Sequence, residues 1–306
     1  MNTILTTHGP IDMASIDGSV LAHEHLIVDL HRTDDQNAVL QVGDPVAQEL
    51  ADCREHHGLG LVIEMTCRGM GRDVVGVDVI SQTSGVPVVV GSGYYYEEFH
   101  DRDLSRLNPY DLAEEFITEI TSGVDDTGIR VGVLGEIGTH GPTPSPAELV
   151  CLTAVALAAQ ETGVAVATHA HLGVGGRGQL DVLTKAGLTP DRISIGHQDL
   201  LEDPPELLNL ARDGVYLAFD TIGKAAYRAD SARASALVAL IDAGFGSQLL
   251  VSNDISRRAY LKANGGQGYA HTLKFADTFR KLGVDEGQLR AIYHDNPLRL
   301  YRIRSS

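Results

Sequence analysis

Short apolar runs rich in β-branched residues alternate with longer amphipathic segments along the whole 306-residue sequence, and this alternation restricts the fold more than any other feature. It is typical of repeated β-α units around a parallel sheet, because a buried strand reads as an apolar run and a covering helix as an amphipathic segment. We predict strands at eight such runs, at residues 18–25, 60–66, 86–93, 130–138, 164–169, 193–197, 215–220 and 248–254.

The segments between these runs predict helices, the clearest at 44–56, 145–163 and 230–246, several with Ser or Asp at the start and Gly at the end. Strand ends recur roughly every 33 residues, the spacing of a closed barrel of about 250 residues. A doubly wound open sheet is the rival fold, but its first strand normally leads into a glycine-rich phosphate loop, and here that strand ends in HEH.

No linker or low-complexity tract divides the chain. We therefore predict one α/β domain over residues 1–306, a (β/α)8 TIM barrel, with a short hairpin over its bottom in the first 17 residues or so. The net charge of −17, without a basic stripe interleaved with aromatics, argues against a nucleic-acid partner.

The sequence also bears on the compartment. Three cysteines, an odd number without CxxC spacing, argue against a disulfide framework. The first residues lack a signal-peptide pattern, and no apolar run approaches the ~18 residues of a spanning helix. We expect a cytoplasmic protein that acts on a small molecule and has no membrane partner.

Residue types that bind metals stand at the carboxyl ends of five predicted strands, which is where barrel enzymes place their active sites. A single histidine there is more often structural, so the signal lies in the complete set. In HEH the two histidines point the same way, because side chains alternate along a strand, while Glu24 points outward. The set consists of His23, His25, Glu136, His169, His197 and Asp254.

Imidazole and carboxylate ligands suit zinc or manganese, and six ligands exceed the need of one tetrahedral ion. The sequence therefore predicts two divalent metal ions, zinc first and manganese second, that share Glu136. Such a pair can hold a bridging hydroxide and polarise a carbonyl or phosphoryl oxygen.

The motifs LAHEHL, GRDV, GSGYY, GEIG, ATHAH, IGHQD, FDTIGK and VSND resemble the phosphotriesterase family of the amidohydrolase superfamily, within it the phosphotriesterase homology subgroup. The resemblance covers almost the whole chain and implies a homodimer. It also implies a first metal site, a second metal site and a bridge, formed respectively by His23, His25 and Asp254, by His169 and His197, and by Glu136 with a hydroxide. True phosphotriesterases bridge the metals with a carboxylated lysine, so the glutamate weakens a phosphotriesterase assignment.

The loops after the last two predicted strands bring a cationic cluster to the barrel mouth, suited to a phosphate or a carboxylate. Solvated loop charges explain it equally well. Tyrosines after the third strand are predicted to line the pocket, with core packing equally expected for at least one of them. The predicted substrate-binding residues are Lys224, Tyr227, Arg257, Arg258 and Tyr94, and no role is assigned to His140, His171 and Arg68.

Relatives with similar loops include lactonases of phosphorylated sugar lactones, so the resemblance makes an anionic lactone the leading substrate class. In the predicted mechanism the hydroxide attacks the carbonyl, and Asp254 takes its proton and passes it to the leaving alkoxide. Three alternatives stay open: an amidase acting on a small N-acyl or cyclic amide, a weak promiscuous phosphotriesterase, and a non-catalytic metal-binding barrel.

Overall fold

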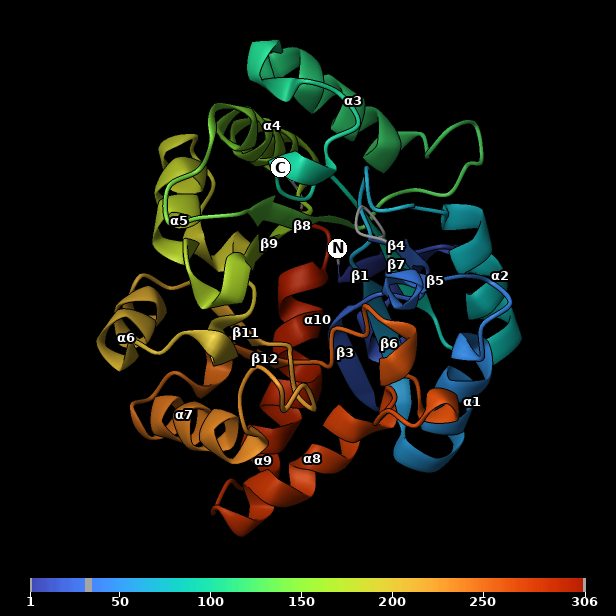
Figure 1. The fold of residues 1–306 in the computed structure, drawn as a ribbon, viewed down its shortest axis with the longest axis vertical. Helices are drawn as coiled ribbons and strands as arrows, with labels where there is room; N and C mark the ends of the chain where they lie inside the picture. The colour runs from blue at the N-terminus through green and yellow to red at the C-terminus, as the bar shows by residue number, and fades with distance from the viewer. Residues whose placement is uncertain (1, 31–34, 305–306) are drawn as a thin grey trace.

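The computed structural model describes residues 2–30 and 35–304. Eight parallel strands form one sheet in the order β12-β11-β10-β9-β8-β7-β6-β3, which curves into a nearly closed barrel (Figure 1). The strands are β3 (Ser19–Glu24), β6 (Leu59–Glu64), β7 (Val88–Ser92), β8 (Val133–Thr139), β9 (Ala165–Ala170), β10 (Ile193–Ile195), β11 (Tyr216–Phe219) and β12 (Leu249–Val251). The predicted barrel is confirmed, and each of its strands falls on a predicted run.

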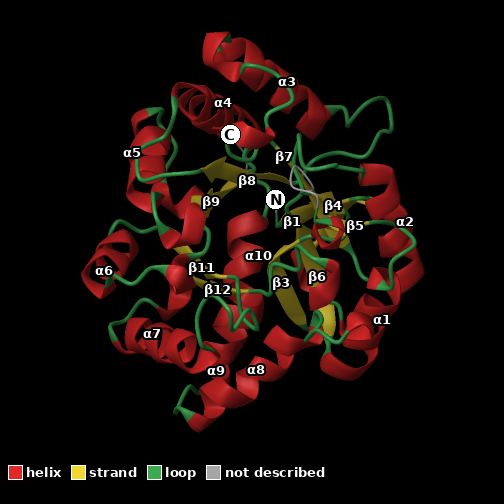
Figure 2. Ribbon diagram, in the orientation of Figure 1, coloured by secondary structure: helices red, strands yellow, loops and turns green. Residues whose placement is uncertain are grey.

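Helices surround the barrel (Figure 2). The sequence explains their ends: α4 starts with a capping box between Ser145 and Glu148 and stops at Gly163, whose φ is 74°. No helix in the described ranges is long and apolar enough to cross a membrane. The helices are α1 (Val46–His57), α2 (Val74–Ser84), α3 (Pro109–Thr121), α4 (Pro146–Thr162), α5 (Gly176–Lys185), α6 (Pro204–Arg212), α7 (Asp230–Asp242), α8 (Ala270–Lys281), α9 (Glu286–Arg290) and α10 (Asn296–Tyr301).

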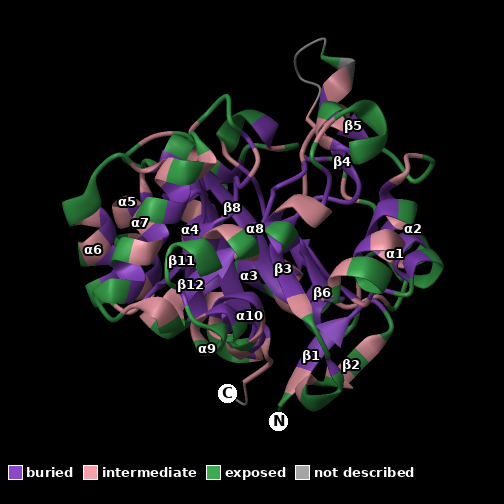
Figure 3. Ribbon diagram, turned by 90° about the horizontal axis from the view of Figure 1, so that it is seen from below, coloured by how far each residue is buried: buried purple, intermediate pink, exposed green. Residues whose placement is uncertain are grey.

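Two antiparallel strand pairs lie at opposite ends of the barrel (Figure 3). The hairpin of β1 (Thr3–Thr6) and β2 (Gly9–Asp12) covers the amino-terminal end, as predicted. Ile4 of this hairpin packs in the same apolar cluster as residues inside the barrel. The pair β4 (Val28–Asp29) and β5 (Val39–Leu40) stands at the other end, where the strands point.

The described sheet order ends at β3 on one side and at β12 on the other, which leaves a seam between these two strands. The buried carboxylate of Glu24 closes this seam. Glu24 Oε1 accepts hydrogen bonds from Ser252 Oγ at 2.7 Å and from the Asn253 backbone nitrogen at 2.8 Å, and its Oε2 accepts from the Ile255 nitrogen at 3.0 Å. Hydrogen bonds to the Glu24 side chain therefore join the two sides of the seam, as backbone hydrogen bonds join neighbouring strands elsewhere in the sheet.

Candidate metal centre and pocket

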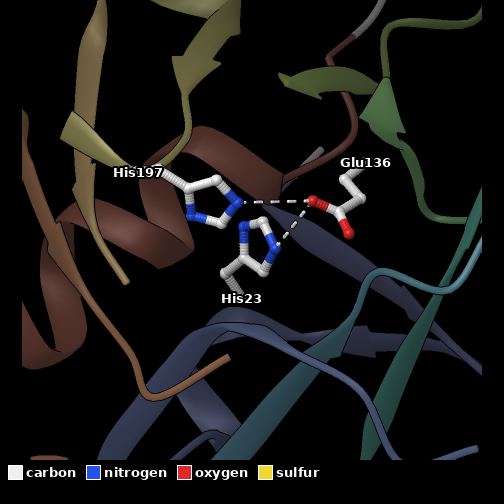
Figure 4. Close-up of side chains that lie close together, drawn as sticks. All are labelled: His23, Glu136 and His197. Carbon is white, nitrogen blue, oxygen red and sulfur yellow. Dashed lines mark ion pairs between the residues drawn. The ribbon is translucent and has the colours of Figure 1, made fainter. Parts of the chain in front are cut away.

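The predicted metal ligands converge on Glu136, at the carboxyl end of the barrel. Glu136 Oε2 lies 3.1 Å from His169 Nδ1 and 3.3 Å from His23 Nε2. His25 Nε2 lies 3.2 Å from Oε1, and His197 Nε2 lies 3.8 Å from Oε2. Figure 4 shows the His23 and His197 rings directed at this carboxylate. Four buried imidazoles from three strands and their end loops thus face one buried carboxylate.

Asp254, in the loop after β12, completes the cluster. Its Oδ1 lies 3.2 Å from His25 Nε2, and its Oδ2 accepts a hydrogen bond from the Lys224 ammonium. The ligand atoms of two groups of three residues each lie within 4.8 Å of one another, and the groups share His23. The first consists of His23, Glu136 and His197, and the second of His23, His25 and Asp254.

Local irregularities turn two of these ligands into the barrel. The strand register shifts between Leu21 and Glu24 in β3 and between Leu134 and Ile137 in β8. Such a shift reverses which side chains face inward, so His23 and Glu136 can face the interior although strict alternation would place them outside. In β9 the alternation is regular, and His169 continues the inward series of that strand.

The hydrogen bonds of the histidine rings fit a metal centre. Asp220 Oδ2 lies 3.0 Å from His23 Nδ1, Asp220 Oδ1 lies 2.7 Å from His197 Nδ1, and Thr66 Oγ1 lies 2.8 Å from His25 Nδ1. These partners leave Nε2 of each ring for the cluster, as outer partners do around metal-binding histidines. His23 Nε2 is buried, and apart from its 3.3 Å contact with the Glu136 carboxylate it has no hydrogen-bond partner among the described residues. A divalent cation would satisfy this atom.

Asp220 was not predicted as a site residue, although it follows β11 at a strand end like the predicted ligands. It is fully buried, and besides the two imidazoles it accepts a hydrogen bond from the His197 backbone nitrogen at 3.0 Å. Its residue type and position gave the same signal as the ligands. Only its contacts identify it as the group that orients two of them.

The charges of the cluster keep both carboxylates ionised and therefore ready to bind a cation. Burial lowers the pKa of His25, but Asp254 and Glu136 raise it to about 9, so a bound cation would displace a proton from this ring. Burial raises the pKa of Glu136, but the imidazoles, His169 first among them, lower it well below its ordinary value. Burial also raises the pKa of Asp254, whereas Lys224 and His25 lower it below its usual range. Burial and the neighbouring His197 lower the pKa of His169 to about 4, so its imidazole is neutral at pH 7.

A pocket of about 230 Å³ adjoins the cluster. Its wall includes three predicted metal ligands, the cations of Lys224 and Arg257, and aromatic and apolar side chains such as Tyr95, Tyr96 and Leu172. A larger pocket of about 440 Å³, lined among others by Met13, contains none of the six predicted ligands. The smaller pocket is therefore the candidate for substrate.

The structure separates the predicted substrate-binding residues into two groups. Lys224, Tyr227 and Arg257 line the pocket. Arg258 does not line it, and its Nε lies 3.2 Å from Asp44. Tyr94 is buried in the hydrophobic core, and its hydroxyl accepts a hydrogen bond from Arg102 at 3.1 Å.

The next tyrosine, Tyr95, lines the pocket where Tyr94 was expected, and its hydroxyl lies 3.2 Å from His169 Nε2. The three mouth residues without an assigned role also differ. His171 lines the pocket and stacks on His140 with 4.7 Å between ring centroids. Arg68 does not line this pocket and forms ion pairs with Glu115 and Glu119.

Known proteins share both this fold and this sequence pattern. Residues 2–301 match the model of the Phosphotriesterase family. The Phosphotriesterase homology protein of Escherichia coli (strain K12) is 34% identical over 287 residues, which cover 93% of this chain and 98% of that protein. Its crystal structure, complexed with phosphate in the active site, matches with a TM-score of 0.90, 35% identity and coverage of 93% and 99%.

Two further relatives carry names of activities. An N-acetyltaurine hydrolase of Salmo salar is 32% identical over 274 residues, which cover 85% of this chain and 78% of that protein. A lactonase of Listeria monocytogenes matches with a TM-score of 0.93 and 25% identity, covering 99% of this chain and 100% of that chain. Together with the candidate metal-binding residues, these likenesses show that the chain is a hydrolase and that it belongs to the phosphotriesterase family.

Proposed function

We propose that the protein hydrolyses a small lactone that carries an anionic group, with phosphorylated sugar lactones as the leading class. The observation that carries this proposal is a single pocket lined both by the predicted ligands His169, His197 and Asp254 and by the cations Lys224 and Arg257. Long-range repulsion by a protein of net charge −17 makes such local cations necessary for binding an anion. The phosphate in the active site of the E. coli relative and the lactonase name of the Listeria relative support it.

The proposed cofactor is a pair of divalent ions, zinc first and manganese second. His23, His25 and Asp254 would hold one ion. His169 and His197 would hold the other, and Glu136, which lies beside both His25 and His169, would serve both. When bound, the ions would act as Lewis acids and lower the pKa of a bound water.

The side chains around the centre supply the proton transfers. Asp254 is kept ionised by Lys224 and His25, so it can accept the proton of the attacking water and deliver it to the leaving alkoxide. Tyr95 faces the same pocket, and burial raises the pKa of its hydroxyl well above the ordinary value. Tyr95 therefore stays protonated, and we assign it as a hydrogen-bond donor to the carbonyl oxygen.

An amidase acting on a small anionic N-acyl amide is the second candidate. It is favoured by the N-acetyltaurine hydrolases, one of which is 32% identical to this chain. N-acetyltaurine combines an amide with a sulfonate, so the same cations would suit it. Amines leave less readily than alkoxides, and the two candidates therefore differ in the proton that the leaving group needs.

A substrate panel tests the proposal on protein whose metal content has been counted. It pairs phosphorylated and unphosphorylated forms of the same sugar lactones and adds N-acetyltaurine and a phosphotriester. We expect the highest kcat/KM for a phosphorylated lactone and slow turnover of the phosphotriester. A higher kcat/KM for the amide would replace the proposal by the second candidate, and no turnover with two ions bound would favour a non-catalytic barrel.

The role of Asp254 is tested by Asp254→Asn, which keeps an oxygen ligand but removes the proton acceptor. We expect most of the metal to remain and kcat to fall by about 100-fold to 10,000-fold. Asp44→Asn is the matched control, because Asp44 contacts Arg258 outside the pocket. An unchanged kcat in Asp254→Asn would rule out the assigned role.

A further inference from the structure

One buried guanidinium lies behind the pocket and contacts two of the loops that carry the site. Arg233, in α7, is 1% exposed. Its Nε donates to Asp199 Oδ2 at 2.7 Å, and its Nη2 donates to Thr221 Oγ1 at 2.9 Å and to the Lys224 carbonyl oxygen at 3.1 Å. Asp199 belongs to the loop after β10, and Thr221 and Lys224 belong to the loop after β11.

The remaining nitrogen of Arg233 holds the far end of the β11 loop. Nη1 donates to the Arg228 carbonyl oxygen and, at 3.0 Å, to Asp230 Oδ1. Asp230 Oδ1 also accepts from the Gly223 backbone nitrogen at 3.0 Å. With these contacts the guanidinium has five acceptors, which matches its five N–H donors.

Asp199 connects Arg233 with the candidate metal cluster. Asp199 lies two residues after His197, is fully buried, and accepts a hydrogen bond from Thr221. Its Oδ1 has no hydrogen-bond partner among the described residues, so its charge depends on the ion pair with Arg233. Thr221 in turn follows Asp220, which holds the Nδ1 atoms of two cluster histidines.

We propose that Arg233 is a positioning residue that fixes Asp220 and Lys224 relative to His197. Arg233 thereby fixes the position of the metal-binding part of the site relative to the anion-binding part. Without these contacts the loop of residues 220–229 would gain conformational freedom, which binding of metal or substrate would have to remove again. The inference about metal binding stands without a known substrate, whereas the inference about Lys224 rests on the proposed function.

The first test is Arg233→Lys, which keeps a positive charge beside Asp199. An ammonium has three donors on one atom and cannot span the acceptors that the planar guanidinium joins. We expect zinc affinity, measured on metal-free protein by competition with a chromophoric chelator, to fall by about 10-fold to 100-fold, as on loss of other outer partners of metal ligands. We also expect the preference for phosphorylated over unphosphorylated lactone to decrease.

Arg192→Lys is the matched control, because Arg192 is also buried but lies away from the site. It donates to the Leu300 and Gly163 carbonyl oxygens, both at 2.6 Å. We expect Arg192→Lys to lower thermal stability and to leave zinc affinity unchanged. Equal losses of zinc affinity in the two variants would reduce Arg233 to a structural residue and overturn the inference.

A double variant separates positioning from the penalty of a buried charge. Arg233→Met with Asp199→Asn removes both charges of the ion pair, so no buried charge is left without a partner. We expect it to unfold near the wild-type temperature yet to bind zinc as weakly as Arg233→Lys. Wild-type zinc affinity in the double variant would overturn the inference, whereas failure of the wild-type protein to bind zinc would overturn the proposed metal centre instead.

Discussion

The two ends of the barrel interior are built from opposite chemistry. Toward the amino-terminal end, uncharged and mainly apolar side chains fill the space between the strands, among them Val20, Leu61, Val89 and Leu250. Within a few residues toward the carboxyl end, histidines and carboxylates converge on Glu136. Buried apolar groups stabilise a fold directly, whereas buried charges are unfavourable unless they are paired or bind a metal. The apolar layer toward the amino-terminal end, here called the lower layer, therefore stabilises the fold. The layer of histidines and carboxylates toward the carboxyl end, the upper layer, forms the candidate binding site.

Two of the clustered residues at the carboxyl end also have an unusual backbone conformation. His197 and Asp254 have φ values of 56° and 52°, in the left-handed region that is unfavourable for residues with a Cβ. Each such residue costs on the order of 1–3 kcal/mol and persists where the surroundings hold it. In this chain the surroundings include Asp220, which binds His197, and Lys224, which binds Asp254. The upper layer thus depends on contacts that the lower layer does not need.

The largest expected effect lies in the lower layer. Leu61 is fully buried, so Leu61→Ala should leave a cavity and lower the free energy of unfolding by about 2–5 kcal/mol. Denaturant unfolding of metal-free protein measures this loss. We expect zinc affinity and kcat of the folded variant to stay at wild-type values, and a parallel loss of zinc affinity would show that the two layers are not separable.

A smaller effect is expected in the upper layer. Asp220→Asn keeps the size of the side chain but weakens its hold on His23 and His197. Zinc affinity should fall by about 10-fold to 100-fold, which corresponds to about 1.4–2.7 kcal/mol. Asp213→Asn, which removes a carboxylate on the surface beside Arg177, is the control. Equal zinc affinity in Asp220→Asn and the control would exclude the orienting role.

The smallest effect is expected at the rim of the pocket. Arg257 lines the pocket and is partly exposed, so Arg257→Ala should raise KM for a phosphorylated lactone by about 5-fold, or about 1 kcal/mol, and leave the unphosphorylated lactone unaffected. The neighbouring Arg258→Ala serves as control, because Arg258 also forms an ion pair at 3.2 Å, with Asp44 where Arg257 has Asp35, but does not line the pocket. A change of the same size for both lactones, or in the control variant, would argue against anion binding at Arg257.

The sequence predicted the barrel and the six side chains that cluster at its carboxyl end because both depend on pattern. Each of the eight strands is an apolar run, and His169 continues a regular alternation along β9. The inward orientation of His23 and Glu136 instead requires the register shifts in β3 and β8. Alternation cannot predict such shifts, so these two candidate ligands were identified by their residue types and by their positions at strand ends.

The sequence pattern did not predict the contacts between loops. Nothing in the pattern distinguishes Tyr94, which packs in the core, from Tyr95, which lines the pocket. In the same way, the sequence predicted that Glu24 points away from the two histidines, but it did not predict that this buried carboxylate contacts Ser252, more than two hundred residues away. Partners so far apart in the chain become visible only when the fold brings them together.

The most direct test of the central claim is the metal content of the protein. Metal-free protein is titrated with zinc, and bound zinc per chain is counted by elemental analysis, for the wild type and for Glu136→Gln. We expect two ions per chain in the wild type and a loss of tight binding in the variant, because the variant removes the charge that both ions would share. One ion or none in the wild type, or two tightly bound ions in Glu136→Gln, would contradict it.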